Sequence, residues 1–147
     1  MFDDPELEQT LHDAYQAHST LLVDKPPDEI EDRLNLLREI VKKSPPRNEG
    51  DQLFVRDGDG GYWFPLMDTI SVGKGEEADL RLVSEYISKK HCCLHQIDGG
   101  WAVKDLNSAN GVYVNGEKVT ERYLKYGDMI QIADQCLIFV TIRSLIS

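Results

Sequence analysis

The sequence predicts a mainly β fold, a sandwich of short strands preceded by a helical hairpin. Three observations support this prediction. From residue 52 onward, short apolar runs alternate with turns rich in Gly, Asp or Asn, as in sandwiches. The N-terminal region instead repeats apolar side chains at helical spacing, and a Pro-rich stretch over residues 44–48 separates the two regions. We therefore expect a helical hairpin over residues 1–44, a linker over 45–50 and a β-sandwich over 51–147.

Two helices are expected in the hairpin. The first covers residues 5–22 and begins with an Asp-Pro pair, while Asp28 and Glu31 form a capping box for a second helix that ends near Lys43. Each helix carries an apolar stripe, and a pair this small is not stable by itself. The stripes over residues 5–43 must therefore pack on the β-domain, form a homodimer or dock a partner protein, and the sequence leaves these alternatives open.

The β region is expected to contain strands joined by tight turns. Residues 57–61 read as a hairpin turn, and Asn115-Gly116 reads as a type I′ turn, because Asn and Gly tolerate positive φ. The expected strands are 52–55, 62–66, 69–72, 80–82, 92–96, 101–105, 112–114, 117–118, 129–132 and 136–142. The expected core residues are Leu80, Leu82, Ile87, Leu106, Val112, Val114, Ile130, Ile132, Ile138 and Val140.

Composition and charge narrow the function classes. The net charge of −10 disfavours nucleic acid as a partner. No apolar run is long enough to enter a bilayer, and the acidic N-terminus is unlike a secretory signal, so we expect a cytoplasmic protein without membrane insertion. Cys92, Cys93 and Cys136 either pack as small residues or, with His91 and His95, form a redox or metal site. Their spacing matches no metal-ligand pattern, so we expect no metal and no cofactor.

Three polar clusters lie between the expected strands, at residues 73–75, 88–91 and 107–111. If these loops meet at one end of a sheet, they bring together a hydroxyl, several ammonium groups, a carboxamide and flexible Gly backbone. Lys supplies charge, Ser and Asn supply directed donors, and Gly allows close approach of backbone N–H groups. This combination is suited to binding a compact anion.

The order and spacing of these clusters resemble a known family. Over roughly residues 50–143 the chain is similar to the forkhead-associated (FHA) domain. The resemblance implies an eleven-stranded β-sandwich that recognises phosphothreonine peptides through loops at one end. The motifs that carry it are Gly73-Lys74, Asp79-Leu80, Ser88-x-x-His91, Asp105-Leu106-x-Ser108-x-Asn110-Gly111 and Val114-Asn115-Gly116.

The resemblance also implies roles for single residues. Ser88 would donate its hydroxyl to the phosphate, and Lys74 and Lys89 would add cationic contacts. Asn110 would hold the peptide backbone on the C-terminal side of the phosphothreonine. The residues expected to support this site are Gly73, His91, Gly111 and Asn115.

Two positions depart from the family pattern. Lys74 stands where the family normally has Arg, and Ala109 stands where it often has a phosphate-binding Thr or Arg. Lys binds phosphate as a point charge, without the planar two-pronged contact of Arg. These departures predict weaker affinity for a phosphopeptide, or a site adapted to unphosphorylated ligands.

We predict a phosphothreonine-peptide-binding adaptor in a signalling or secretion assembly, with a Thr-phosphorylated protein as its partner. Ser88 and His91 have no nucleophile-elbow motif around them, so we do not expect an enzyme. The alternative is a phosphorylation-independent interaction or assembly protein that uses the N-terminal helices and carries a degenerate phosphate site.

Overall fold

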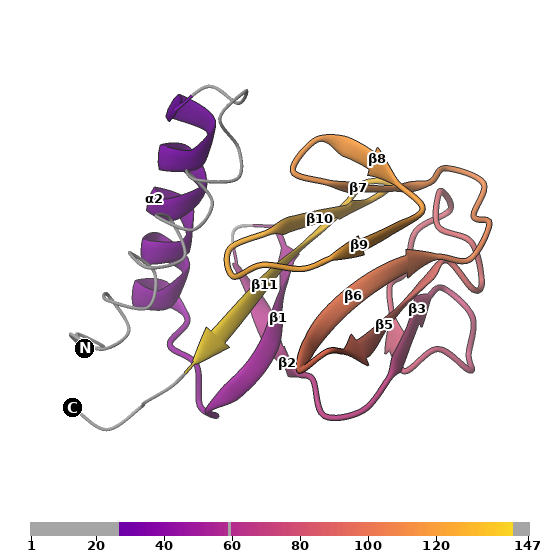
Figure 1. The fold of residues 1–147 in the computed structure, drawn as a ribbon, viewed down its shortest axis with the longest axis horizontal. Helices are drawn as coiled ribbons and strands as arrows, with labels where there is room; N and C mark the ends of the chain where they lie inside the picture. The colour runs from indigo at the N-terminus through magenta and orange to yellow at the C-terminus, as the bar shows by residue number, and fades with distance from the viewer. Residues whose placement is uncertain (1–26, 59, 143–147) are drawn as a thin grey trace. The chain divides into compact units, whose positions relative to one another are not determined.

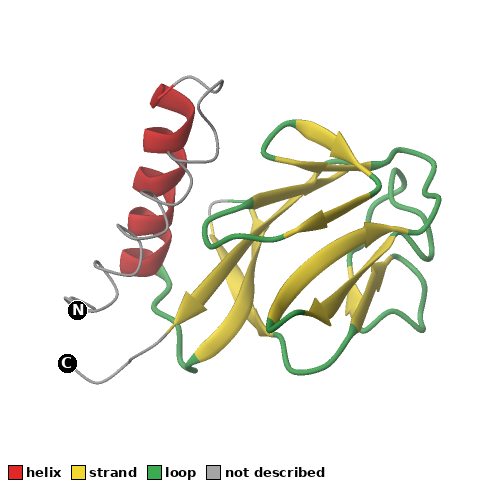
Figure 2. Ribbon diagram, viewed as in Figure 1, coloured by secondary structure: helices red, strands yellow, loops and turns green. Residues whose placement is uncertain are grey.

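The computed structural model describes residues 27–58 and 60–142. Within this range the chain has one helix and eleven strands in two sheets (Figure 2). The predicted mainly β fold, a sandwich of about eleven short strands, is confirmed. The expected first helix over residues 5–22 lies outside the described residues, and no helix inside them is long and apolar enough to cross a membrane.

Helix α2 (Pro27–Lys43) is the expected second helix. It begins at Pro27, whose fixed φ suits the first helical position, so Asp28 lies inside the helix and not before it. At the other end, the Ser44 N–H donates to the Ile40 carbonyl at 2.7 Å. The predicted apolar stripe is buried, and its buried members are Leu34, Leu37, Ile40 and Val41.

The strands follow one another with short connections (Figure 1). They are β1 (Gly50–Asp57), β2 (Gly60–Pro65), β3 (Ile70–Gly73), β4 (Leu80–Arg81), β5 (Cys92–Ile97), β6 (Gly100–Asp105), β7 (Val112–Val114), β8 (Glu117–Val119), β9 (Glu121–Tyr123), β10 (Met129–Ile132) and β11 (Gln135–Ile142). One sheet has the order β2-β1-β11-β10-β7-β8 and the other the order β4-β3-β5-β6-β9. Strands β3 and β4 pair in parallel, whereas β5 is antiparallel to both β3 and β6.

Strand β9 is the element that the sequence pattern did not predict. Its residues Glu121, Arg122 and Tyr123 are exposed or half-buried, so they show no apolar alternation. The strand forms because it pairs with the edge of β6, where Tyr123 lies opposite Ala102. This pairing is a long-range contact that local periodicity cannot reveal.

The chain divides into two compact units. Of the described residues, the first holds those up to Pro65, Lys125–Gly127 and residues 139–142. In this unit the Trp63 indole N–H donates to the Ser44 carbonyl at 2.7 Å. The second unit holds Leu66–Leu124 and Asp128–Ile138, and therefore the whole five-stranded sheet and all three polar clusters.

The second unit carries its own apolar core. Most of the expected core residues in it are buried, but Leu106 is 37% exposed, so its prediction as a core residue was wrong. It directly follows β6 and lines an open pocket. The β3–β4, β4–β5 and β6–β7 loops gather at one end of this unit (Figure 1).

Candidate functional site

The β3–β4 loop is held against the β4–β5 loop by its backbone. Gly73 is buried, and a Cβ atom there would lie 2.1 Å from the Lys89 carbonyl oxygen. Only glycine permits this close approach. The Lys74 N–H donates to the Ser88 carbonyl at 3.1 Å, and the Gly75 N–H donates to the Lys89 carbonyl at 3.2 Å. These bonds bring the expected phosphate ligands Lys74, Ser88 and Lys89 into one region.

His91 is fully buried and joins two loops. Its Nδ1 accepts the Ser88 N–H at 3.1 Å, and its Nε2 lies 2.8 Å from the Gly111 carbonyl. Because Nδ1 is an acceptor, the ring proton resides on Nε2, which donates to Gly111. The imidazole thus fixes the β4–β5 loop relative to the β6–β7 loop.

The Ser88 hydroxyl is oriented by the β6–β7 loop. Its oxygen accepts the Ala109 N–H at 3.1 Å, and the hydroxyl donates to no described residue, so its proton is available for a ligand. His91 bonds the backbone N–H of Ser88 and the Gly111 carbonyl, and therefore has no ring nitrogen on the hydroxyl. Ser88 and His91 do not have the geometry of a nucleophile and its general base.

Local hydrogen bonds shape the β6–β7 loop. The Ser108 N–H donates to Asp105 Oδ1 at 3.2 Å, and the Ser108 hydroxyl accepts the Gly111 N–H at 2.9 Å. Asn107 and Gly111 have φ angles of 58° and 79°, the left-handed region that Asn and Gly tolerate best. This conformation places Ala109 and Asn110 at the exposed tip of the loop.

Asn110 reaches back to the β4–β5 loop. Its Nδ2 donates to the Tyr86 carbonyl at 2.6 Å. Within the described residues, the second amide proton and Oδ1 of Asn110 have no partner, so both are available to a peptide backbone. The structure therefore brings Asn110 close to the chain that leads to Ser88.

Asn115 lies in a different connection from the other expected site residues. With Gly116 it forms a two-residue turn in which both φ angles are positive, at 53° and 86°, as a type I′ turn requires. Its side chain donates to Asp128 Oδ1 at 2.8 Å and accepts the Met129 N–H at 2.9 Å. Through these two bonds Asn115 anchors the β7–β8 hairpin to the start of β10.

A pocket of about 800 Å³ adjoins the loops. It is lined by Lys74 and Lys89, and also by Arg81 and Lys90, which sequence reasoning left out of the site. The Arg81 Nε donates to the Lys74 carbonyl at 3.0 Å. Alternation between Leu80 and Leu82 could have placed Arg81 on the outward face, but only the β3–β4 pairing puts it beside Gly73.

The structure favours packing roles for the cysteines. All three are free thiols. Burial raises the pKa of the fully buried Cys92 thiol, with a smaller contribution from Cys93, and burial also raises the pKa of Cys93. Raised pKa values keep these thiols protonated and weakly nucleophilic. His95 is bonded to Glu121 at 2.7 Å, and the described residues contain no group of His, Cys, Asp and Glu suited to a metal.

Comparison with known proteins places these features in a family. A family model of the FHA domain matches residues 70–133. The oxoglutarate dehydrogenase inhibitor of Corynebacterium diphtheriae is 33% identical over 99 residues, which cover 66% of this chain and 68% of that protein. The glycogen accumulation regulator GarA of Mycolicibacterium smegmatis is 36% identical over 73 residues, covering 50% of this chain and 46% of that protein.

Solved structures agree with this match. The FhaA FHA domain, crystallised in complex with the intracellular domain of Rv3910, has a TM-score of 0.57 and 30% identity, and the match covers 60% of this chain and 98% of that one. A structure from a study of phosphothreonine-dependent FHA domain interactions has a TM-score of 0.60 and 28% identity, with coverages of 65% and 99%. Sequence, loop geometry and fold all lead to the same conclusion: this chain belongs to the forkhead-associated domain family.

Proposed function

We propose that this chain is a binding module for phosphothreonine peptides. One observation carries the proposal. The Ser88 hydroxyl oxygen accepts the Ala109 N–H and donates to no described residue, and backbone hydrogen bonds hold its loop against the loop of Lys74. A hydroxyl donor on loops that also carry two lysines is chemically matched to a phosphate dianion.

In this proposal Ser88 donates to a phosphate oxygen, while Lys74 and Lys89 neutralise the charge. Each charge-assisted hydrogen bond of this kind contributes about 1.5–3 kcal/mol. Asn110 offers its free amide proton and Oδ1 to the backbone on the C-terminal side of the phosphothreonine. No covalent step is involved, and the module acts by binding alone.

In this proposal four residues support the phosphate site without contacting the peptide: Gly73, His91, Gly111 and Asn115. The bonds from His91 to Ser88 and Gly111 hold two loops in place before any ligand arrives. Such preorganisation reduces the conformational entropy lost on binding. These residues therefore raise the affinity for the peptide although they do not contact it.

We further propose that the module is an adaptor in a cytoplasmic signalling or secretion assembly, with a Thr-phosphorylated protein as its partner. One relative is named as an inhibitor of oxoglutarate dehydrogenase and another as a regulator of glycogen accumulation, and one solved FHA domain was crystallised with part of another protein. In this arrangement residues 1–44 form a docking or dimerisation hairpin, 45–50 a linker and 51–147 the binding domain.

Two observations favour a second function. Asn110 already bonds the Tyr86 carbonyl, and Lys74 cannot make a two-pronged phosphate contact. Both features suit a module that no longer needs phosphate and binds a partner through its N-terminal residues.

Titration separates the two functions. Wild-type and Ser88→Ala protein are titrated against a degenerate phosphothreonine peptide library and its unphosphorylated twin. We expect phosphate-dependent binding that Ser88→Ala weakens by about tenfold or more. The control is Thr141→Ala, which removes a hydroxyl that donates to Asp51 outside the three loops and should keep phosphate-dependent binding. Binding that ignores the phosphate, or no binding at all, would favour the second function.

A further inference from the structure

The pocket beside the phosphate loops is lined by four cationic side chains, two more than the proposed phosphate site uses. We call it the cation pocket and define it by Lys74, Arg81, Lys89 and Lys90, with Leu106 on its wall. It shares Lys74 and Lys89 with the proposed phosphate site, but neither Ser88 nor Asn110 lines it. The cation pocket is thus a neighbouring space, and Arg81 and Lys90 belong to it alone.

The four cations of the pocket are unpaired. Within the part of the chain that the structure describes, none of them forms an ion pair, although Glu76 and Glu77 line the same pocket. Four positive charges around one space repel one another, and this occurs in a chain whose net charge is −10. A bound anion would relieve this repulsion.

Arg81 is already oriented for such an anion. Its Nε donates to the Lys74 carbonyl at 3.0 Å, and no other described partner engages the guanidinium group. The terminal nitrogens are therefore free for the planar two-pronged contact that Arg makes with a carboxylate or a phosphate. A carbonyl that fixes the guanidinium lowers the entropy lost when the contact forms.

The direction of the peptide follows from Asn110. Its carboxamide bonds the Tyr86 carbonyl, and neither Asn110 nor Tyr86 lines the cation pocket, so a backbone held by Asn110 lies outside that pocket. If Asn110 holds the backbone C-terminal to the phosphothreonine, the cation pocket faces the N-terminal side.

We propose that the cation pocket binds a second anionic group of the same peptide, located N-terminal to the phosphothreonine. The preferred ligand is then a phosphothreonine preceded within a few residues by an acidic or phosphorylated side chain. Arg81 and Lys90 are the specificity-determining residues. The inference rests on the proposed phosphothreonine-binding function.

The test uses the full chain and the best phosphothreonine peptide from the library in four forms. The first has Ala at the three positions before the phosphothreonine, the second has Glu there, the third has a phosphoserine there, and the fourth has Glu at the three positions after it. We expect the second or third form to bind about tenfold or more tightly than the first. The stronger of the two identifies a carboxylate or a phosphate as the source of the charge.

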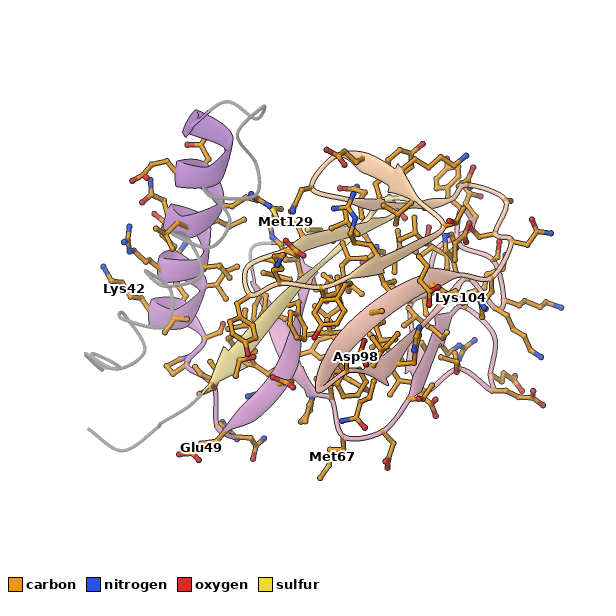
Figure 3. All side chains as sticks on the ribbon, in the orientation of Figure 1. Lys42, Glu49, Met67, Asp98, Lys104 and Met129 are labelled. Carbon is orange, nitrogen blue, oxygen red and sulfur yellow. The ribbon has the colours of Figure 1, made fainter. Side chains whose placement is uncertain are left out.

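Arg81→Gln and Lys90→Gln are expected to remove this gain while changing affinity for the Ala form by no more than about twofold. Because both side chains are exposed, both variants should fold, and their thermal unfolding is measured beside binding. Lys104→Gln is the matched control, since Lys104 is exposed on β6 outside the pocket (Figure 3). It changes the net charge equally and should retain the gain.

Several results would overturn the inference. Equal affinity for the first three forms would show that the pocket binds no second anion. Preference for the fourth form would show that the pocket faces the C-terminal side of the phosphothreonine. An equal loss for every phosphopeptide in Arg81→Gln would assign Arg81 to the phosphothreonine itself. If the Ala form still binds only when its threonine is phosphorylated, the proposed function holds even where this inference fails.

Discussion

The buried support around Ser88 and the cation pocket beside it both use residues of the segments that flank β4. In the support, Gly73 and His91 are buried and the side-chain nitrogens of His91 are both hydrogen-bonded. In the pocket, Arg81, Lys89 and Lys90 are exposed and have no ion-pair partner among the described residues. Residues that are close in the sequence thus differ in their surroundings: those of the support are buried and hydrogen-bonded, whereas these cations of the pocket are exposed.

The difference separates stability from recognition. Breaking the support leaves buried backbone groups unpaired, and such groups cost free energy of folding. Removing a cation from the pocket costs folding little, because exposed charges contribute weakly to stability. Changes in the support should therefore act on unfolding and binding together, whereas changes in the pocket should act on binding alone.

The largest effect is expected for His91→Ala. The substitution leaves the Ser88 N–H and the Gly111 carbonyl unpaired and opens a cavity, so the free energy of unfolding should fall by about 3 kcal/mol. Urea unfolding measures the change. His95→Ala is the control, because its ring contacts exposed Glu121 and should cost less than about 1 kcal/mol. If the two variants lost the same unfolding free energy, the buried hydrogen bonds of His91 would contribute no more to stability than the exposed contact of His95.

Gly73→Ala should have the next largest effect. The added Cβ atom would lie 2.1 Å from the Lys89 carbonyl oxygen and 2.9 Å from that of Ser88, so the two loops must separate. We expect a loss of about 2 kcal/mol in unfolding free energy together with loss of phosphopeptide binding. Gly60→Ala, which meets nothing within 4 Å, should change neither quantity appreciably. Full binding by Gly73→Ala would contradict a rigid junction between the loops.

Lys74→Arg should leave stability unchanged and strengthen binding. A guanidinium group at this position can make the two-pronged phosphate contact that an ammonium cannot, so affinity for a phosphothreonine peptide should rise roughly three- to tenfold. Calorimetric titration measures the gain, and Lys104→Arg should show none. Unchanged affinity in Lys74→Arg would mean that this side chain does not reach the phosphate.

Salt should produce the smallest effect, and it should change binding by the cation pocket without changing the stability that the support provides. Raising the salt concentration from about 50 to 300 mM screens exposed charges, so phosphopeptide affinity should fall several-fold. The unfolding free energy should change by less than about 0.5 kcal/mol over the same range, since His91 holds its two loops through uncharged backbone groups of Ser88 and Gly111. An affinity that is insensitive to salt would contradict the role given to the cations.

Sequence reasoning was most successful where local chemistry determines structure. Apolar alternation and turn residues located ten of the eleven strands, and the Asn115-Gly116 turn follows from the tolerance of both residues for positive φ. It failed where a long-range contact decides. Strand β9 exists because it pairs with β6, and Leu106 is exposed because the chain leaves the sheet there.

The candidate site shows the same division. Lys74, Ser88, Lys89 and Asn110 were predicted because they stand in motifs of recognisable order. Arg81 was missed because nothing local distinguishes it from any exposed residue between two buried leucines. Its place beside Lys74 depends on the parallel pairing of β3 with β4, which is visible only in the fold.

The central claim is that the loops around Ser88 hold a phosphothreonine. The most direct measurement is an NMR titration of the full chain with a phosphothreonine peptide and with its unphosphorylated twin, monitoring backbone amide signals. We expect the signals of Gly75, Lys89 and Asn110 to shift only with the phosphorylated peptide. Shifts confined to α2, or identical shifts with both peptides, would contradict the claim.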